Sequence, residues 1–390
     1  MPRGPTTRAV HSWRDAPSAP LPSAPPIVQS STFLFDDLDE FARVADSKIE
    51  GGYLYSRWAN PTVAAAMATL ADLEGAGASL GFASGMAAIS TTILAHVQAG
   101  QAVVAAAQLY GGTFAFLTGA LKKAGIRVEF VDVADMEAVR AAVDDDTALL
   151  YCETMANPAL RIADLEAWSE IARGADAPLV VDATFTPPVL LQPLAHGADV
   201  TIHSSTKYLG GHADHLGGVV SGDRRWLDPI HRTVIELGGV MAPMEAFLLH
   251  RGMQTLDIRM DRHSSNGLGL AKMLSEHPGV ERVIYPGLES HPDHAKATEL
   301  LKGRSGGILA VELKGGREAG RKVMQRVELF GRAASLGGTK SLIVHPASIT
   351  HTQLDAEGLA AAGLTEGTLR VSVGIEDLED LIADMEQALA

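Results

Sequence analysis

Short apolar runs alternate with longer stretches of helical periodicity from residue 79 onward. An apolar run of four to six residues predicts a buried strand, and the intervening stretches have the length and composition of helices. Strands that alternate with helices form a parallel sheet with helices on both faces, so the pattern predicts an α/β fold. The expected strands span residues 79–83, 102–107, 128–133, 147–152, 178–182 and 198–203.

The pattern changes after about residue 245. A long helical stretch is expected over 244–277, followed by a strand in GGILAVELKGG, a strand in LRVSVGIED and a C-terminal helix. This order predicts a large domain over 51–245 and a smaller α+β domain over 246–390. Residues 1–50 begin with a proline-rich stretch and are interpreted as an N-terminal arm.

Composition excludes several classes of protein. Of the 390 residues, 46% are apolar and 20% are charged, which is typical of a soluble globular protein. The net charge of −15 carries no Lys/Arg-rich block, so nucleic acid is not expected as a partner. The single cysteine, Cys152, fits a reducing compartment, and cytoplasm is expected. No signal peptide or membrane span is expected, because polar residues and glycines interrupt the most apolar stretch, 87–110.

Polar side chains follow most of the expected strands: Ser84, Tyr110, Glu153, Asp182 and Lys207. In open α/β sheets, ligands bind beyond the carboxyl ends of the strands, where several loops converge. These five residues are therefore candidates for one site.

Lys207 lies in the segment TIHSSTKYLGGHADHLGG (201–218). Burial and neighbouring positive charge can lower the pKa of a lysine and free its amine as a nucleophile. Asp182 ends an apolar run, and a protonated pyridine nitrogen would pair with such a carboxylate. A strand-end Asp followed about 25 residues later by a strand-end Lys is the order that a pyridoxal phosphate site requires. A surface lysine and an Asp that caps the next turn are the alternative interpretations.

A small turn at Ser84 and Gly85 separates a strand from a helix and would expose backbone N–H groups that bind phosphate. An ordinary helix N-cap has the same sequence. Tyr110 could stack its ring on a cofactor or pack as a half-buried core residue.

Together these segments resemble the family of pyridoxal phosphate enzymes that includes cystathionine γ-synthase, cystathionine γ-lyase, methionine γ-lyase and homoserine sulfhydrylase. The matching motifs are PPIVQSSTF, YSRWANPT, ASGMAAI, LYGGT, ETMANP, VDATF, SSTKYLGGH, RGMQTL, SLGGTKSL, HPASITH and LRVSVGIED. The resemblance implies a mostly parallel seven-stranded sheet of the aspartate-aminotransferase-like fold type I. It also implies a homotetramer, built as a dimer of dimers, in which the N-terminal arm contacts a neighbouring subunit.

The resemblance assigns roles to individual residues. Lys207 resembles the lysine that forms a Schiff base with pyridoxal 5′-phosphate, Asp182 the partner of the pyridine nitrogen, and Tyr110 the stacking tyrosine. Residues that match the phosphate site are Ser84, Gly85, Met86, Ser204 and Thr206, with Tyr55 and Arg57 reaching the phosphate of a neighbouring subunit. Residues that match the substrate site are Arg370, Asn157 and Ser335, which would hold the α-carboxylate, together with Glu153 and Lys340.

The chemistry that the resemblance implies is γ-elimination or γ-replacement on a sulfur amino acid or an O-activated homoserine, as in transsulfuration and in methionine and cysteine metabolism. Lys207 would move protons at Cα and Cβ so that a γ-substituent departs. The enzyme class is a carbon–sulfur lyase or γ-replacement transferase, and cystathionine γ-lyase or γ-synthase proper is the alternative.

Several positions depart from the relatives. Gly112 occupies the position of the cysteine in the LYGCT motif that methionine γ-lyases resemble. Lys340 occupies a position at which cystathionine-using members usually have glutamate. A lysine there would repel the distal ammonium of cystathionine. The chain lacks the long insertion of O-acetylhomoserine sulfhydrylases, and GHADHLGG and Trp58 are unusual.

Three competing hypotheses belong to other classes. The S-x-x-K pattern formed by Ser204 and Lys207 is typical of serine acyl-enzymes, but S-D-N and K-T-G do not accompany it. Four histidines (His212, His215, His291 and His294) lack the spacing of a zinc site, so no metal is expected. An inactive member kept for interactions would have lost Lys207 or Asp182, and both are present.

Overall fold

The computed structural model describes residues 4–11, 22–47, 52–156, 160–349 and 364–390. The strands are β1 (Ala78–Phe82), β2 (Ala102–Ala106), β3 (Arg127–Val131), β4 (Thr147–Glu153), β5 (Leu179–Asp182), β6 (Val200–His203), β7 (Gly218–Gly222), β8 (Val280–Ile284), β9 (Ile308–Leu313), β10 (Gly331–Arg332), β11 (Leu342–Val344) and β12 (Thr368–Ser372). The α-helices are α1 (Pro5–His11), α2 (Leu38–Ser47), α3 (Pro61–Glu74), α4 (Gly85–His96), α5 (Gly111–Phe116), α6 (Met136–Ala142), α7 (Leu165–Gly174), α8 (Arg224–Leu237), α9 (Pro243–Met253), α10 (Leu256–Glu276), α11 (His294–Leu300), α12 (Gly316–Arg326) and α14 (Leu378–Leu389). Short π- or 3₁₀-helical turns are η1 (Leu117–Leu121), η2 (Pro193–His196) and η3 (Pro346–Ser348).

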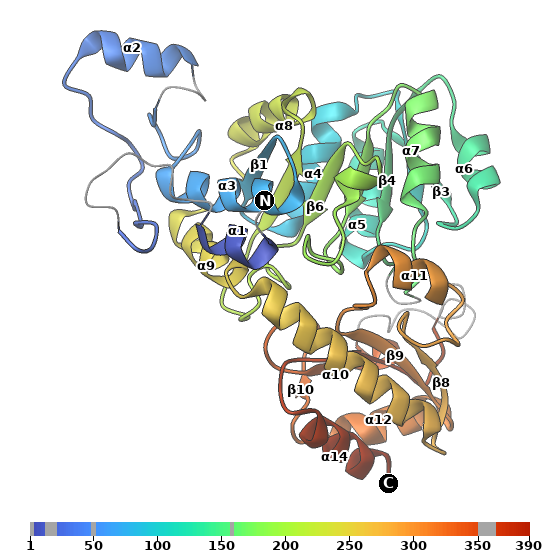
Figure 1. Ribbon diagram of the computed structural model, residues 1–390. Helices are drawn as coiled ribbons and strands as arrows, with labels where there is room; N and C mark the ends of the chain where they lie inside the picture. Colours follow the sequence, from blue (N-terminus) through green and yellow to red (C-terminus); the bar gives the residue numbers. More distant parts are fainter. Residues whose placement is uncertain (1–3, 12–21, 48–51, 157–159, 350–363) are drawn as a thin grey trace.

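The larger sheet has seven strands in the order β1-β7-β6-β5-β4-β2-β3. Its strands are parallel except for β7, which runs antiparallel to both of its neighbours. Helices cover both faces, so the predicted mostly parallel α/β fold is confirmed (Figure 1). The six expected strands are present within two residues of their expected bounds, whereas β7 was not expected.

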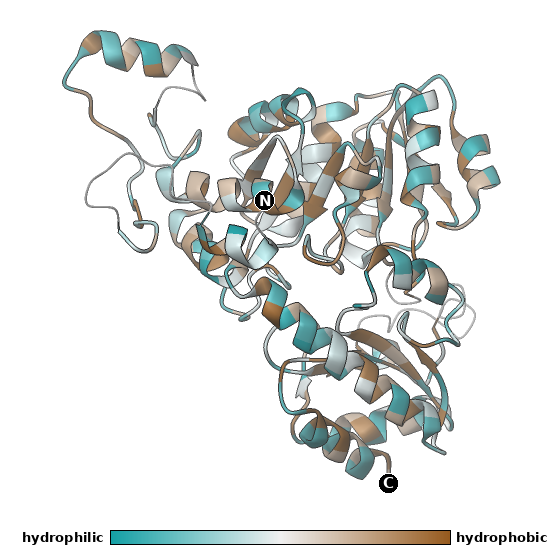
Figure 2. Cartoon of the chain, in the orientation of Figure 1, coloured by the Kyte–Doolittle hydropathy of each residue, from teal (hydrophilic) through white to brown (hydrophobic). Residues whose placement is uncertain are grey.

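The sheet forms where the chain is apolar without alternation. β2 and β7 are buried along their whole length, because both faces of the sheet are covered. The strands are brown and the outer faces of many helices are teal in Figure 2, which is the distribution that a buried sheet requires. One hydrophobic cluster fills the space between this sheet and its helices.

Strand register brings the polar strand ends together. Glu153 at the end of β4 pairs with Asp182 at the end of β5, and Asp182 pairs with Ile202 of β6. Because these strands are parallel, the residues that follow them meet at one edge of the sheet. Lys207 follows β6 at this edge.

The C-terminal part contains a second sheet, with the order β10-β11-β12-β9-β8 and its own hydrophobic cluster. The expected helical stretch over 244–277 is divided into α9 and α10, with Gln254 and Thr255 between them. Helix α10 runs from the larger sheet to the second one (Figure 1). Its first turns contribute Leu256 to the first cluster, and its last turns contribute Leu274 to the second.

Helix α1 of the N-terminal region contacts α3 and α10, and its Ala9 belongs to the hydrophobic cluster of the larger sheet. Helix α2 lies apart from the other elements in Figure 1. Leu34 and Leu38, next to this helix and at its start, are 95% and 76% exposed. Within the described ranges, no helix has the combination of length and apolar composition that crossing a bilayer requires.

Candidate active site

A cavity of about 230 Å³ lies at the carboxyl edge of the larger sheet. Ten of the residues that the sequence singles out line it: Ser84, Gly85, Met86, Tyr110, Glu153, Asp182, Ser204, Thr206, Lys207 and Arg370. The other lining residues are mostly apolar: Ile89, Met155, Thr184, Phe185, Leu216, Ala334 and Leu336.

Two buried carboxyl groups form one wall. The N–H of Thr184 donates to Asp182 at 2.9 Å, and the hydroxyl of Tyr151 donates to it at 3.5 Å. The N–H of Tyr110 donates to Glu153 at 2.5 Å. Burial raises the pKa of Asp182, and burial together with the nearby charge of Asp182 raises the pKa of Glu153 well above its ordinary value.

Asp182 forms no ion pair with a Lys, Arg or His side chain of the described residues. A buried carboxylate without an ion-pair partner is stabilised by any cation that enters the cavity. A protonated ring nitrogen would be such a cation.

Lys207 faces the same cavity from the turn that follows β6. Its Nζ donates to Ser335 Oγ at 3.0 Å. Burial lowers the pKa of Lys207, and the positive charge of Arg370 lowers it further. Both effects favour the neutral amine, which is the form that acts as a nucleophile or a base.

The turn between β1 and α4 has the features of an anion site. Ser84 caps α4, and its Oγ accepts from the N–H of Ala87 at 3.1 Å. The N–H groups of Gly85 and Met86 lie in the first helical turn, where no helical carbonyl is available to them. A Cβ at position 85 would lie 2.8 Å from the Cβ of Ser204, so only glycine lets these two segments approach so closely. Helix N-termini of this kind bind phosphate groups.

Arg370 reaches the cavity from β12 of the second sheet. Its Nη2 donates to the carbonyl of Ser335 at 3.3 Å. Its Nε is buried and has no hydrogen-bond partner among the described residues. Burial lowers the pKa of this guanidinium. An unsatisfied donor on a planar guanidinium in a cavity is suited to a carboxylate, which can accept from two donors at once.

Tyr110 precedes α5 at the mouth of the cavity, and its side chain is 52% exposed. Its ring lies so close to Gly112 that a Cβ at position 112 would be 2.5 Å from the ring atom Cε1. Gly112 therefore permits the observed position of the ring.

Among the predicted site residues, Tyr55, Arg57 and Lys340 do not line this cavity of the described chain, and a further one lies outside the described residues. Tyr55 and Arg57 come from the segment before α3, where Arg57 donates to the carbonyl of Ile235 at 2.6 Å and does not line this cavity of the described chain. Lys340 is exposed and is likewise absent from the described lining. Asn157 lies outside the described residues. The roles predicted for these four residues stay predictions.

The histidines make other contacts. His212 contacts the carbonyl of Gly210 at 2.9 Å, and His294 contacts the carbonyl of Pro286 at 2.9 Å. Among the described residues, no group of three or more His, Cys, Asp or Glu side chains is placed to hold a metal ion.

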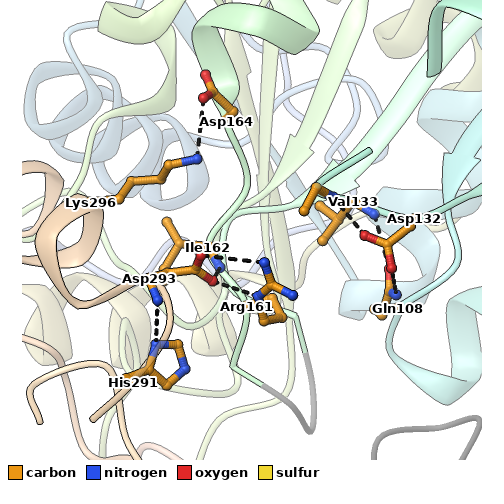
Figure 3. A network of polar contacts seen from close by, with 10 residues as sticks. Gln108, Asp132, Val133, Arg161, Ile162, Asp164, His291, Asp293 and Lys296 are labelled. Carbon is orange, nitrogen blue, oxygen red and sulfur yellow. Dashed lines mark hydrogen bonds and ion pairs between the residues drawn. The ribbon is translucent and has the colours of Figure 1, made fainter. Parts of the chain in front are cut away.

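The segment that follows β4 is held against the region before α11 (Figure 3). Asp293 accepts from Arg161 Nε at 2.7 Å and from the N–H of Ile162 at 3.1 Å, while its own N–H donates to His291. Ile162 forms a bridge with Met155, which lines the cavity. This polar network therefore fixes one edge of the cavity from outside.

Contributors that were not found from the sequence include Thr184, Tyr151 and Leu216. Thr184 donates to Asp182 and accepts from the N–H of Ser204 at 2.9 Å, so it joins the ends of β5 and β6. Its place two residues after a strand-end Asp is a usable signal, because such residues donate back to the carboxylate. Tyr151 lies inside β4 and Leu216 in a glycine-rich loop, and neither has a local signal.

These side chains fit pyridoxal 5′-phosphate. The buried Asp182 suits a cationic ring nitrogen, the N-terminus of α4 suits a phosphate group, and the Lys207 amine, whose pKa is lowered, lines the same cavity. The anchoring roles follow: Asp182 would hold the ring nitrogen, Ser84 and Gly85 the phosphate, and Lys207 the aldehyde carbon.

Comparison with known proteins gives consistent results. A family model described as "Cys/Met metabolism PLP-dependent enzyme" matches residues 6–390. The chain is 42% identical to the L-methionine gamma-lyase of Pseudomonas putida, covering 98% of this chain and 96% of that protein. It is 40% identical to a cystathionine gamma-synthase of Mycobacterium bovis, covering 99% and 97%. A crystal structure from Campylobacter jejuni, described as an O-acetylhomoserine (thiol)-lyase with N′-pyridoxyl-lysine-5′-monophosphate at position 205, has a TM-score of 0.94 and 33% identity over 99% and 100% of the two chains.

Proposed function

The chain belongs to the Cys/Met metabolism PLP-dependent enzyme family, and on this basis we propose that the cavity at Lys207 acts on amino acids with an uncharged or acyl-activated γ-substituent. The enzyme depends on pyridoxal 5′-phosphate and catalyses γ-elimination or γ-replacement on a sulfur amino acid or O-acetylhomoserine. The observation that carries the proposal is a single cavity on which Lys207, Asp182 and Arg370 converge and whose remaining lining is mostly apolar.

The protein side of the reaction is proton transfer at Lys207. When bound, the cofactor supplies an electron sink next to the Cα of the substrate. Burial and the positive charge of Arg370 lower the pKa of the Lys207 amine, which favours the neutral form that accepts the Cα proton and delivers it elsewhere on the substrate. Its hydrogen bond to Ser335 gives Nζ a resting position in the cavity.

Arg370 orients the substrate. Its unsatisfied Nε and its Nη2 provide two donors for the α-carboxylate, while the contact with Ser335 fixes the guanidinium. Ser335 thus touches both Lys207 and Arg370, which couples the position of the base to that of the carboxylate clamp.

The apolar part of the cavity lining selects the γ-substituent of the substrate. Met155, Phe185 and Leu216 favour a γ-substituent without charge. The sequence predicts that Lys340 repels the distal ammonium of cystathionine. Lys340 is exposed, so water screens this repulsion. Cystathionine is the second candidate substrate, favoured by the 40% identity to a cystathionine gamma-synthase.

A homotetramer built from two dimers is part of the proposal. Supporting it, Arg57 and Tyr55 lie away from the cavity of their own chain, and α2 extends from the body with Leu34 and Leu38 exposed. Sedimentation of the holoenzyme tests the assembly. An active monomer, or an Arg57→Ala variant with unchanged cofactor affinity, would show that the site is not shared.

A cytoplasmic location is also proposed. The single thiol, Cys152, is buried on β4, and burial raises its pKa, so it is not poised to form an intermolecular disulfide. Cell fractionation with antibodies against the protein tests this location.

Two measurements test the function. Borohydride reduction of the cofactor-loaded protein, followed by peptide mapping, should attach the pyridoxyl group to Lys207, and a label on another lysine would exclude the assignment. Products are then measured for L-methionine, homocysteine, cystathionine and O-acetylhomoserine, the last with and without sulfide. Turnover of cystathionine above every other compound would return cystathionine γ-lyase or γ-synthase to first place.

A further inference from the structure

Directly behind the cavity, three side chains form a hydrogen-bonded chain. The Nε2 of His215 lies 2.8 Å from Ser205 Oγ, and its Nδ1 lies 2.8 Å from Glu245 Oε2. Glu245 Oε2 also accepts from the N–H of Leu216 at 2.9 Å. His215 and Ser205 are buried, whereas the side chain of Glu245 is 33% exposed.

The direction of these hydrogen bonds follows from the chemistry of the groups. An ionised Glu245 only accepts, so the Nδ1 of His215 carries the proton and donates. Burial lowers the pKa of His215, with Glu245 opposing the shift, which favours the neutral ring. The Nε2 of that tautomer accepts, and Ser205 therefore donates its hydroxyl proton to it.

The order Ser–His–Glu is also that of a hydrolytic triad, but access rules out that use. Ser205 has no exposed surface. A Cβ at position 217 would lie 2.6 Å from Ser205 Oγ, so Gly217 covers the hydroxyl. A substrate carbonyl has no route to it.

The three residues instead surround the turn that carries Lys207. The carbonyl of Ser205 accepts from the N–H of Gly210 at 2.9 Å, which closes this turn. Thr206 Oγ1 donates to the carbonyl of Gly217 at 3.2 Å and accepts from its N–H at 3.1 Å. Segment 204–211 and segment 215–217 are therefore joined twice, once through Thr206 and once through His215.

The ring of His215 is held tightly between these segments. A Cβ at position 210 would lie 3.0 Å from its Cδ2, and a Cβ at position 217 would lie 2.6 Å from its Cε1. Leu216, between His215 and Gly217, lines the cavity, and its N–H is held by Glu245. One histidine thus connects the lysine turn, the Leu216 wall and helix α9.

We propose that Ser205, His215 and Glu245 are positioning residues that fix the Lys207 turn against the Leu216 wall of the cavity. The inference rests on the proposed role of Lys207. His215 belongs to the unusual segment GHADHLGG, whose purpose the proposed reaction itself does not explain. The arrangement fixes the position of the Lys207 amine relative to Leu216, as a preorganised site requires.

The test uses the holoenzyme and four variants: His215→Ala, His215→Gln, Glu245→Ala and the control His250→Ala. Gln can still accept from Ser205 near the Nε2 position, so His215→Gln is the conservative rescue. His250 is a buried histidine on the same helix as Glu245, within hydrogen-bond distance of Thr69 and Gln254, and does not line the cavity. Glu245→Ala alters a partly exposed residue and keeps the test open if His215→Ala does not fold.

The readouts are Tm, the cofactor dissociation constant, the visible circular dichroism of the bound cofactor, and kcat and KM. We expect His215→Ala and Glu245→Ala to change the dichroism band and to lower kcat more than they change KM, by up to about 100-fold. His215→Gln should lie between His215→Ala and the wild type. His250→Ala should lower Tm while it leaves the dichroism and kcat unchanged.

A His215→Ala enzyme that loses Tm as His250→Ala does, yet keeps the wild-type dichroism and kcat, would overturn the inference. So would a His215→Gln enzyme no better than His215→Ala. Lys207→Ala is measured alongside to separate the two proposals. If Lys207→Ala leaves the dichroism unchanged, the proposed function fails. If Lys207→Ala changes the dichroism and His215→Ala does not, only the positioning role is excluded.

Discussion

Replacing Gly112 by alanine should slow catalysis without unfolding the protein. An added Cβ would lie 2.5 Å from Cε1 of the Tyr110 ring and 3.1 Å from the sulfur of Met86. Carbon atoms in ordinary contact are about 3.5–4 Å apart, so the ring must move by about 1 Å or more. A shift of this size in a group that positions the reactants costs up to about 100-fold in rate.

Gly112→Ala should change the free energy of unfolding little, because the partly exposed ring of Tyr110 can turn toward solvent. Tyr110 is 52% exposed, and turning it from its preferred rotamer costs about 0.5–1.5 kcal/mol. The Gly→Ala change offsets about 0.4–1 kcal/mol of this by restricting the unfolded chain. The free energy of unfolding should therefore change by about 1 kcal/mol or less.

Gly111 provides the matched control, since a Cβ there would have no atom within 4 Å. Gly111→Ala and Gly112→Ala lie side by side in the same helix, and both are measured for kcat, KM and Tm. We expect wild-type kinetics for Gly111→Ala and a lowered kcat for Gly112→Ala. If the two variants have kcat values within about twofold of each other, the position of the Tyr110 ring does not control the rate.

Three further predictions concern charge. Lys340→Glu should raise kcat/KM for cystathionine by about fivefold or less, because Lys340 is exposed, and a gain well above tenfold would mean that it reaches the substrate. Glu74→Ala should cost about 1–3 kcal/mol in urea unfolding, because it leaves the buried Nε2 of His203, 2.6 Å away, without its hydrogen-bond partner; a cost near zero would contradict this. Burial raises the folded-state pKa of Glu153, so the cofactor-free protein should lose stability as pH rises above about 4.3, the unfolded value, whereas Tm of Glu153→Gln should fall less over that range.

Local pattern was sufficient for the parallel part of the larger sheet. Runs such as AVVAA in β2 are apolar without alternation, which only a strand covered on both faces explains. β7 was not expected, because its sequence GVVSG begins and ends with glycine and resembles a loop. The break between α9 and α10 was also not expected, since neither Gln254 nor Thr255 is a strong helix breaker.

The candidate site also contains residues that the local sequence predicts and residues that it does not. Asp182 and Lys207 follow adjacent parallel strands, so their convergence could be predicted from the order of elements alone. Arg370 lies in a different sheet and was named only through resemblance to a family. The contact of His215 with Glu245 depends on how α9 packs against the glycine-rich loop, and neither segment carries a local pattern that encodes it.

The antiparallel strand β7 also sets the order in which the protein can mature on the ribosome. β1 joins the larger sheet only through β7, so Phe82 must wait for Gly218 before it is paired. Pairing between segments so distant in the chain is slow and comes late in folding. The turn that carries Lys207 lies between β6 and β7, whereas Ala334, Leu336 and Arg370, which also line the cavity, are translated later still. A nascent chain arrested before β7 would present an open sheet to chaperones and would have no finished pocket in which to retain the vitamin-derived cofactor.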